Sequence, residues 1–269
     1  MQNLIPGRED YIKGLIQLTD HYEKLKELLA ADYSCDASDF DIEENVLTEA
    51  EVTSEGRVYC RKKPFFRMVT TGTNAVITAD PALDSFLVKF MKCGSGASLF
   101  ETPKLISLEK ELNKHGQTLD DIHRMYLPFR NTEPELDIPV KWFKDKEINR
   151  FYGNRNFPNA ICTRPDKNRP DRLVICAYDD KKIIGMAGAS EDAAGWLQIG
   201  IDVLPEYRSK GIGTYLVTLL KNRIAELGLI PFYGTSTGNI HSANIALKSG
   251  FAPAWTEVGS KPLNKIMMY

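Results

Sequence analysis

The spacing of apolar residues predicts both helices and strands in the first half of the chain. Residues 19–31 have a helical period, which a cap at Thr19 or Asp20 would begin. Residues 58–78 contain two extended runs around the turn-like sequence TGTN, a pattern typical of a β-hairpin. Asp80–Pro81 and Thr102–Pro103 each combine a capping residue with a first-turn proline, so a helix is expected after each. This half therefore has apolar material for a core of its own.

The second half has a different rhythm, in which strands alternate with helices after an initial hairpin. The polar segment 128–138 holds two prolines and separates the halves, which predicts an N-terminal α+β domain of residues 1–133 and a second domain of residues 134–269. The expected elements of the second domain are a strand at 140–143, a helix at 144–153, a hairpin at 173–190, a strand at 196–204, a helix at 214–228, a strand at 231–237, a short helix from Asn239 to Gly250 and a strand at 251–258.

Composition narrows the class of protein. The 269 residues are 43% hydrophobic and 26% charged, with a net charge of −2, which argues against a general nucleic-acid binder. No apolar run is long enough to cross a membrane, and the first residues lack a secretory signal, so a cytoplasmic protein is expected. Five cysteines and four histidines are scattered without metal-ligand spacing, which favours reduced thiols and no metal.

One charge run stands out against this average. Residues 32–56 carry nine acidic residues and no lysine or arginine. The run is either a solvated acidic face or a surface that attracts a cationic acceptor such as a polyamine or an amino sugar.

The segment 202–217, DVLPEYRSKGIGTYLV, joins a predicted strand to a predicted helix. Two glycines and two cations in this turn predict an anion site, because backbone N–H groups and the helix N-terminus favour phosphate there. The turn lacks the GxxxxGK of a nucleoside-triphosphate loop, and Leu216 occupies the place of the third glycine of a dinucleotide fingerprint. It does match R-x-x-G-x-G through Arg208, Gly211 and Gly213. The alternative is that the glycines only close a tight turn.

Other residues around this turn extend the match. V-x-P precedes it at Val203 and Pro205, N-x-x-S follows at Asn239 and Ser242, and G-F follows at Gly250 and Phe251. Over residues 137–258 this order resembles the GNAT superfamily of N-acetyltransferases, and the whole layout is similar to two-domain bacterial members whose acceptor is unassigned. The resemblance implies an α/β (mixed α+β) fold, in which a C-terminal GNAT domain with a central mixed, splayed sheet follows a smaller α+β domain.

The resemblance also implies that acetyl-CoA binds where two parallel strands, 196–204 and 230–237, splay apart. Its pyrophosphate would lie on the N–H groups of residues 210–214, and its pantetheine arm would pair with backbone of the first strand. Asn239 would face the pantetheine amides or would only cap its helix. The implied binding residues are Ile201, Val203, Arg208, Lys210, Gly211, Ile212, Gly213, Thr214, Asn239 and Ser242.

The catalytic residues are less well defined by the resemblance. In such a fold an amine attacks the thioester and a thiolate leaves, with help from a base and an oxyanion donor. Ala246 and Gly234 stand where many members have a tyrosine and a glutamate. Asp202 and His241 are therefore the catalytic candidates. The non-catalytic alternative for Asp202 is a polar residue at a strand edge, and that for His241 is a surface histidine. The loop acids Glu191 and Asp192 are further options. Tyr215 and Tyr233 could replace the missing tyrosine, although aromatic residues at such positions are more commonly core. Cys162 and Cys176 are assigned to packing.

Three functions remain open at this level. The first is transfer of an acetyl group from acetyl-CoA to a primary amine of a small molecule. The second is an acyl-CoA-binding module without turnover, and the third is acetylation of a protein amine. Neither nucleic acid nor membrane is expected as a partner; the oligomeric state stays open, although a homodimer is common in this superfamily.

Overall fold

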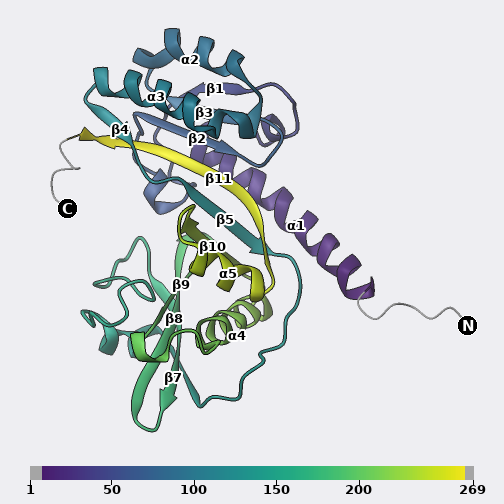
Figure 1. Cartoon of the computed structure of the whole chain (residues 1–269), viewed down its shortest axis with the longest axis vertical. Coiled ribbons are helices and arrows are strands. Elements are labelled where there is room, and N and C mark those ends of the chain that lie inside the picture. The colour runs from purple at the N-terminus through teal and green to yellow at the C-terminus, as the bar shows by residue number, and fades with distance from the viewer. Residues whose placement is uncertain (1–7, 264–269) are drawn as a thin grey trace, which may run out of the picture. The chain divides into compact units, whose positions relative to one another are not determined.

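The computed structural model describes residues 8–263, with side chains from residue 20 onward, and divides the chain into two compact units. Unit A comprises residues 1–21 and 126–253, and unit B comprises residues 22–125 and 254–269. Two strands, β5 (His123–Pro128) and β11 (Phe251–Pro262), pass from one unit to the other along the chain (Figure 1). The units differ from the predicted domains because residues 254–269 belong to the same unit as residues 22–125. The domain boundary at 133/134 stays a prediction.

Unit B is built on a small sheet in the order β1–β3–β2–β11, with β4 paired to β11. The β1–β3 pair is parallel, whereas β2 pairs antiparallel with both β3 and β11. Its elements are α1 (Arg8–Tyr33, of which residues 22–33 belong to this unit), η1 (Ala37–Phe40), β1 (Val46–Glu49), η2 (Val58–Cys60), β2 (Phe66–Thr70), β3 (Ala75–Ala79), η3 (Pro81–Leu83), α2 (Asp84–Phe90), η4 (Met91–Cys93), η5 (Gly96–Phe100), α3 (Thr102–Lys114) and β4 (Gln117–Leu119).

The hairpin and both proline-initiated helices of unit B are confirmed. The β2–β3 register runs from Phe66↔Ala79 to Thr70↔Ala75, and the Asp80 side chain accepts a hydrogen bond from the Ala82 N–H. Helix α1, however, begins at Arg8 and continues through the predicted cap at residues 19–20, so that start signal was wrong. Residues 58–60 form a 3₁₀ turn and not the start of a strand. The first strand of the hairpin begins only at Phe66.

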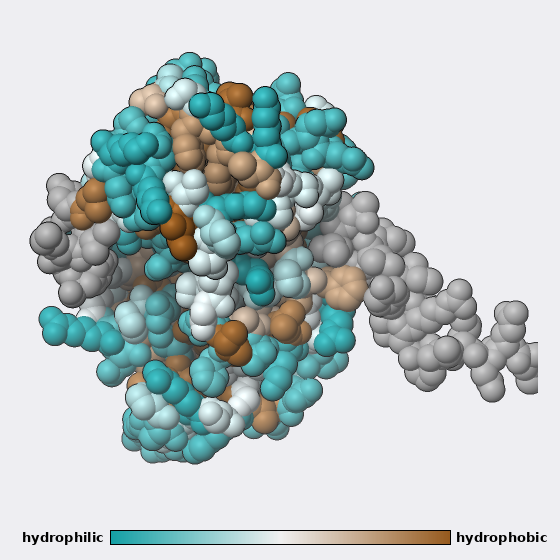
Figure 2. All heavy atoms as spheres, turned by 45° about the horizontal axis from the view of Figure 1, so that its top comes forward, coloured by the Kyte–Doolittle hydropathy of each residue, from teal (hydrophilic) through white to brown (hydrophobic). Residues whose placement is uncertain are grey.

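Unit B also buries a charged cluster. Arg57 is 0% exposed; its Nε donates to Asp32 Oδ2 at 2.5 Å, and its Nη1 and Nη2 donate to Glu257 Oε1 and Oε2 at 3.0 and 2.6 Å. Trp255 donates its Nε1–H to the same Glu257 carboxylate. Asp32, the first acidic residue of the run 32–56, is therefore buried in the core. Seven of the other eight acidic residues in that run are exposed. The face in Figure 2 is mostly hydrophilic, with apolar side chains in small groups.

Unit A is a sheet in the order β5–β10–β9–β8–β7–β6, flanked by helices. From β6 to β9 each strand is antiparallel to its neighbour, whereas β9 and β10 are parallel. The remaining elements are β6 (Val140–Lys144), η6 (Asp145–Phe151), β7 (Asp171–Asp179), β8 (Lys182–Ala193), β9 (Trp196–Val203), η7 (Pro205–Tyr207), α4 (Ile212–Glu226), β10 (Ile230–Ser236) and α5 (Ile240–Lys248). The predicted strands and helices are present, except that residues 145–151 form a 3₁₀ and not an α-helix.

The two faces of this sheet carry separate apolar cores. α4 and α5 cover one face with a cluster that includes Leu216, Leu220 and Ile224, all 0% exposed. On the other face η6 and the following loop bury Phe157, Ala160 and Ile161 against β7 and β8. Alternation of side chains along β7–β9 explains how one set of strands supplies both cores.

Candidate functional site

The two parallel strands β9 and β10 separate partway along their length. Their register pairs run from Trp196↔Ile230 to Ile199↔Tyr233, yet β9 continues to Val203 and β10 to Ser236. Backbone groups of residues 200–203 and 234–236 therefore face a gap between neighbouring strands. An extended chain of amides could lie in this gap and bond to both edges.

The N-terminus of α4 lies directly after β9 and η7. Gly211 is its N-cap residue with φ 81° and ψ −5°, and Ser209 also has a positive φ of 61°. No side chain caps the helix, and the first intrahelical bond is donated by Tyr215 N–H to the Gly211 carbonyl at 2.9 Å. The N–H groups of the first turn are thus left for an anion, and the positive end of the helix dipole favours one.

The two glycines of this turn are required for different reasons. Gly211 needs a left-handed backbone, and a Cβ there would meet only Leu136 Cδ1, at 3.4 Å. Gly213 has no such backbone demand, but a Cβ would lie 3.0 Å from Ile245 Cδ1. Gly213 therefore allows α5 to pack closely on α4. This contact explains the glycine independently of its predicted role in ligand binding.

The cations of the turn are exposed and make local contacts. Arg208 Nε donates to the Val203 carbonyl at 3.0 Å, which engages a backbone group that was predicted to pair with pantetheine. Lys210 Nζ lies 5.1 Å from the centre of the Tyr207 ring, and Lys182 Nζ lies 5.2 Å from the same ring. Lys182 is paired with Glu206 at 2.7 Å, so the positive charge beside the open N–H groups comes from Arg208 and Lys210.

Helix α5 begins beside the separated strands. Asn239 Oδ1 accepts from Ser242 N–H at 3.1 Å, so its capping role is confirmed, while its contact with pantetheine stays a prediction. The Ser242 hydroxyl is 2.8 Å from the Tyr233 hydroxyl. Burial raises the pKa of Tyr233, although the bond to Ser242 opposes the rise, so this phenol keeps its proton at neutral pH.

The Tyr233–Ser242 pair is the feature that sequence reasoning missed. Tyr233 is only 2% exposed, as expected of a core residue, but it is also the last residue of β10 that pairs with β9. Its ring packs edge-on against Tyr126 and near Phe251. The N-x-x-S pattern indicated Ser242, but only the folded sheet brings the tyrosine to it.

Asp202 has a structural task that the sequence did not predict. Its Oδ2 accepts from the backbone N–H groups of Asn159 and Ala160 at 2.6 and 2.9 Å, and its Oδ1 accepts from Asn159 Nδ2 at 2.7 Å. The same segment presses on the sheet, because a Cβ on Gly200 or Gly188 would lie 1.9 Å from the Asn159 or Ala160 carbonyl oxygen. Asp202 thus holds the segment 159–160 on the sheet beside the gap.

The remaining candidates fall outside this arrangement. His241 is exposed on α5, and Ala246 is 0% exposed against α4. Glu191 and Asp192 lie in β8 and not in a loop, which corrects the prediction: Glu191 binds Arg172, and Asp192 accepts from Arg169 Nε at 2.5 Å.

Tyr215 and Cys176 are buried, as their predicted packing roles require, whereas Cys162 is only half-buried. The Tyr215 hydroxyl donates to the Ile138 carbonyl at 3.2 Å. Burial raises the pKa of Cys176 to about 12 and, as the first of several causes, that of Cys162 to about 11, so both thiols stay protonated.

Comparison with known proteins agrees with this geometry. Residues 130–251 match the model of the acetyltransferase (GNAT) family. Curated proteins gave no match in sequence. The match to the family model supports a GNAT acetyltransferase domain at residues 130–251, preceded by a further region, in agreement with the predicted fold class.

Several solved structures named as acetyltransferases show a limited similarity to part of this chain. A GNAT-family acetyltransferase from Colwellia psychrerythraea is 14% identical with a TM-score of 0.41, over 57% of this chain and 60% of its own. A GCN5-related N-acetyltransferase from Kribbella flavida is 16% identical with a TM-score of 0.43, over 57% and 63%. YncA of Salmonella typhimurium, solved with acetyl-CoA, is 13% identical with a TM-score of 0.34, over 48% and 95%. The chain spans less than two thirds of the first two proteins.

Residues 8–263 lack two further features. None of the helices there is both long and apolar enough to span a bilayer. Groups of three or more His, Cys, Asp or Glu side chains that could hold a metal ion are also absent from the described part of the chain.

Proposed function

We propose that the protein is an acyl-CoA-dependent N-acyltransferase, which moves an acetyl group from acetyl-CoA to a primary amine of a small molecule by direct attack. The observation that carries the proposal is the gap between β9 and β10 followed at once by an uncapped α4 with Gly211 at its start. A gap with free backbone groups suits an amide-containing arm, and an uncapped helix start suits a pyrophosphate. The family match over residues 130–251 supports the same reading.

Acetyl-CoA would be held mainly by backbone groups. N–H groups of residues 210–214 would bind the pyrophosphate, with Lys210 adding positive charge at its exposed edge. Ile201 and Val203 would offer backbone to the pantetheine arm, although the Val203 carbonyl would first have to be shared with Arg208. Asn239 and Ser242 would line the other side from α5.

The thioester supplies an activated acyl group. Residues of the chain must then supply a proton to the leaving thiolate and accept one from the attacking amine. The leaving thiolate needs a proton, and the buried Tyr233 hydroxyl, bonded to Ser242, is a protonated donor at the vertex of the gap. Asp202 would act as a positioning residue that fixes the segment 159–160 next to the thioester. Asp202 or His241 as a base for the incoming amine stays a prediction.

A module that binds acyl-CoA without turnover is the second candidate. Ala246 is wholly buried where many relatives are expected to have a catalytic tyrosine, and Gly234 stands at the expected glutamate. If Tyr233 does not replace the missing acid, binding would remain while transfer would not.

The first test is calorimetric titration of acetyl-CoA into the wild type, Gly211→Asp and Gly228→Asp. Gly211→Asp puts a negative side chain at the proposed pyrophosphate site. Gly228 is a matched control because it follows the other end of α4, has a similar φ of 74° and has no neighbour within 4 Å of a Cβ. We expect binding by the wild type and by Gly228→Asp, and at least tenfold weaker binding by Gly211→Asp.

The outcomes separate the candidates. Equal affinity in all three proteins, or no binding in any, would overturn the proposed site. Binding followed by release of CoA only when small amines are added supports the acyltransferase. Binding with no release across small amines, lysine peptides and protein N-termini favours the sensing module, and release with peptides alone favours a protein acetyltransferase.

A further inference from the structure

Unit A has a pocket at the opposite end of β9 from the gap. Its volume is about 340 Å³, within the range of small-molecule sites. Leu197 lies near the start of β9, where this strand is still paired with β10, and Leu229 immediately precedes β10. The pocket is therefore separated from the proposed acyl-CoA site by the paired half of the two strands.

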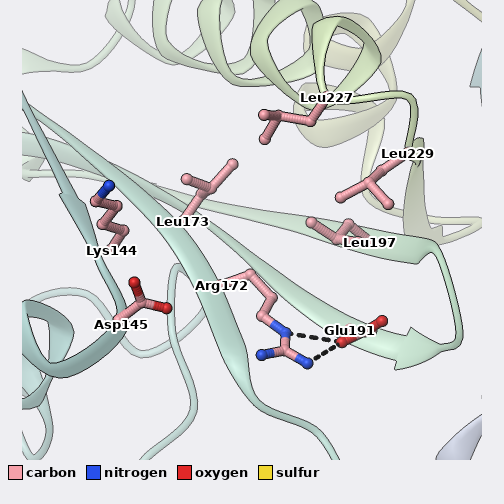
Figure 3. A pocket seen from close by; sticks show the side chains of 8 residues that line it. All are labelled: Lys144, Asp145, Arg172, Leu173, Glu191, Leu197, Leu227 and Leu229. Atoms are coloured by element: carbon pink, nitrogen blue, oxygen red, sulfur yellow. Dashed lines mark hydrogen bonds and ion pairs between the residues drawn. The ribbon is translucent and has the colours of Figure 1, made fainter.

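One wall of the pocket is apolar. Leu173, Leu197, Leu227 and Leu229 come from β7, β9 and the connection between α4 and β10, and they converge on a common space (Figure 3). Leu197 is 1% exposed and forms the floor of the pocket. Leu227 is 48% exposed, so about half of its apolar surface is in contact with water. Covering this wall with an aliphatic group would remove apolar surface from water.

Four charged residues form the rest of the wall, and two of them neutralise each other. Arg172 Nε donates to Glu191 Oε2 at 2.7 Å, and Arg172 Nη2 donates to the same oxygen (Figure 3). The other oxygen of Glu191 accepts from Gly195 N–H at 3.2 Å. This pair is therefore satisfied within the protein and adds little net charge.

Lys144 and Asp145 differ from that pair. Both side chains are exposed, and within residues 20–263 neither makes an ion pair or a side-chain hydrogen bond, so a cation and an anion lie next to each other at the leucine wall (Figure 3). Asp145, the first residue after β6, has a positive φ of 50°, and it lines the pocket together with Lys144, the last residue of that strand. An aspartate tolerates this conformation better than most residues, although at a cost.

We propose that this pocket binds an aliphatic α-amino acid as its zwitterion. The carboxylate would meet Lys144, the ammonium would meet Asp145, and a branched aliphatic side chain would lie on the leucines. Each part of the pocket then has a counterpart, because a neutral hydrocarbon would leave the charged pair unused, and a simple acid or amine would leave one charge uncompensated. The site is independent of the proposed acyl transfer.

The test is titration of L-leucine into the full chain by chemical-shift perturbation or calorimetry, with 4-methylpentanoate, isoamylamine and glycine as probes that each lack one part. We expect leucine to bind at least tenfold more tightly than any of the three. Lys144→Ala and Asp145→Asn should each weaken leucine binding at least tenfold, and asparagine keeps the tolerance of a positive φ. Lys146→Ala, on an exposed neighbour outside the pocket, should leave binding unchanged.

Several results would overturn the proposal. They are the absence of leucine binding at about 20 mM, equal binding of leucine and 4-methylpentanoate, and undiminished binding in both pocket variants. Leucine that bound at the proposed acceptor site instead would depend on acetyl-CoA and would be insensitive to Lys144→Ala. Binding that persists in Gly211→Asp but is lost in Asp145→Asn would support the pocket whether or not the acyltransferase proposal holds.

Discussion

Lys221 in α4 is a buried cation whose titration can be followed as a change in stability. It is 2% exposed, and its Nζ donates to the Arg130 carbonyl at 2.8 Å and to Thr132 Oγ1 at 3.2 Å. These acceptors are neutral, so they compensate only in part for the water that the ammonium group loses. Burial, followed by the charge of Arg130, lowers the pKa of Lys221 from 10.5 to about 8.

The direction of the effect follows from the two pKa values. The unfolded chain holds a proton on Lys221 up to about pH 10.5, whereas the folded protein releases it near pH 8, so the unfolded state binds more protons between these values. Stability from this residue therefore rises with pH across that window. The charged form costs the folded state about 3 kcal/mol below pH 8, and about 2 kcal/mol of this is relieved between pH 7 and pH 9.5.

The perturbation is Lys221→Met, which keeps the length of the side chain and removes the charge. Free energies of unfolding would be measured by urea denaturation at pH 7 and at pH 9.5 for both proteins. Buried thiols and tyrosines lower the stability of both proteins at high pH, but they cancel in the difference. We expect the wild type to gain about 2 kcal/mol over the variant between the two pH values.

Lys248→Met, on an exposed lysine of α5, is the matched control and should show no such gain. A wild-type-minus-variant difference that stays flat between pH 7 and pH 9.5, or that falls, would refute the reasoning. It would mean that the buried ammonium is stabilised as well as in water.

Three further variants test other parts of the structure. Gly200→Ala should lower the free energy of unfolding by about 3 kcal/mol, because the new Cβ would lie 1.9 Å from a loop carbonyl oxygen. Gly238→Ala is the control and should be near neutral, because nothing lies within 4 Å of its Cβ; thermal melts would compare the two variants. Arg57→Met should cost about 4 kcal/mol in urea denaturation, since it leaves two carboxylates unpaired in the core; a loss below about 1 kcal/mol would contradict this. Tyr233→Phe should lower kcat at least about tenfold with the acetyl-CoA affinity unchanged, and an unchanged kcat would remove Tyr233 from the proposed mechanism.

Local signals in the sequence predicted most elements correctly. The β2–β3 hairpin, the capped helices after Asp80 and Asn239, and the alternation of strands and helices in unit A all depend on contacts between neighbours in the chain. Such contacts are encoded by a few adjacent residues. One local signal failed at α1, which begins at Arg8 and continues past the predicted cap at Thr19–Asp20.

The candidate site divides in the same way. The R-x-x-G-x-G and N-x-x-S patterns indicated the start of α4 and the cap of α5, because a left-handed glycine and a capping asparagine are local requirements. They did not indicate that Gly213 is needed for the contact with Ile245, nor that Asp202 is engaged by residues 159–160.

By itself, then, the sequence determined the turn chemistry, the order of elements and the match of residues 130–251 to the GNAT family model. Only the tertiary structure decided which distant polar groups meet: Tyr233 with Ser242, Asp202 with the segment 159–160, and Arg57 with Asp32 and Glu257. The physical reason is that a buried polar group must find a partner, and the partner is chosen by the register of strands and the path of loops. Those depend on the whole sheet and not on neighbours in the sequence.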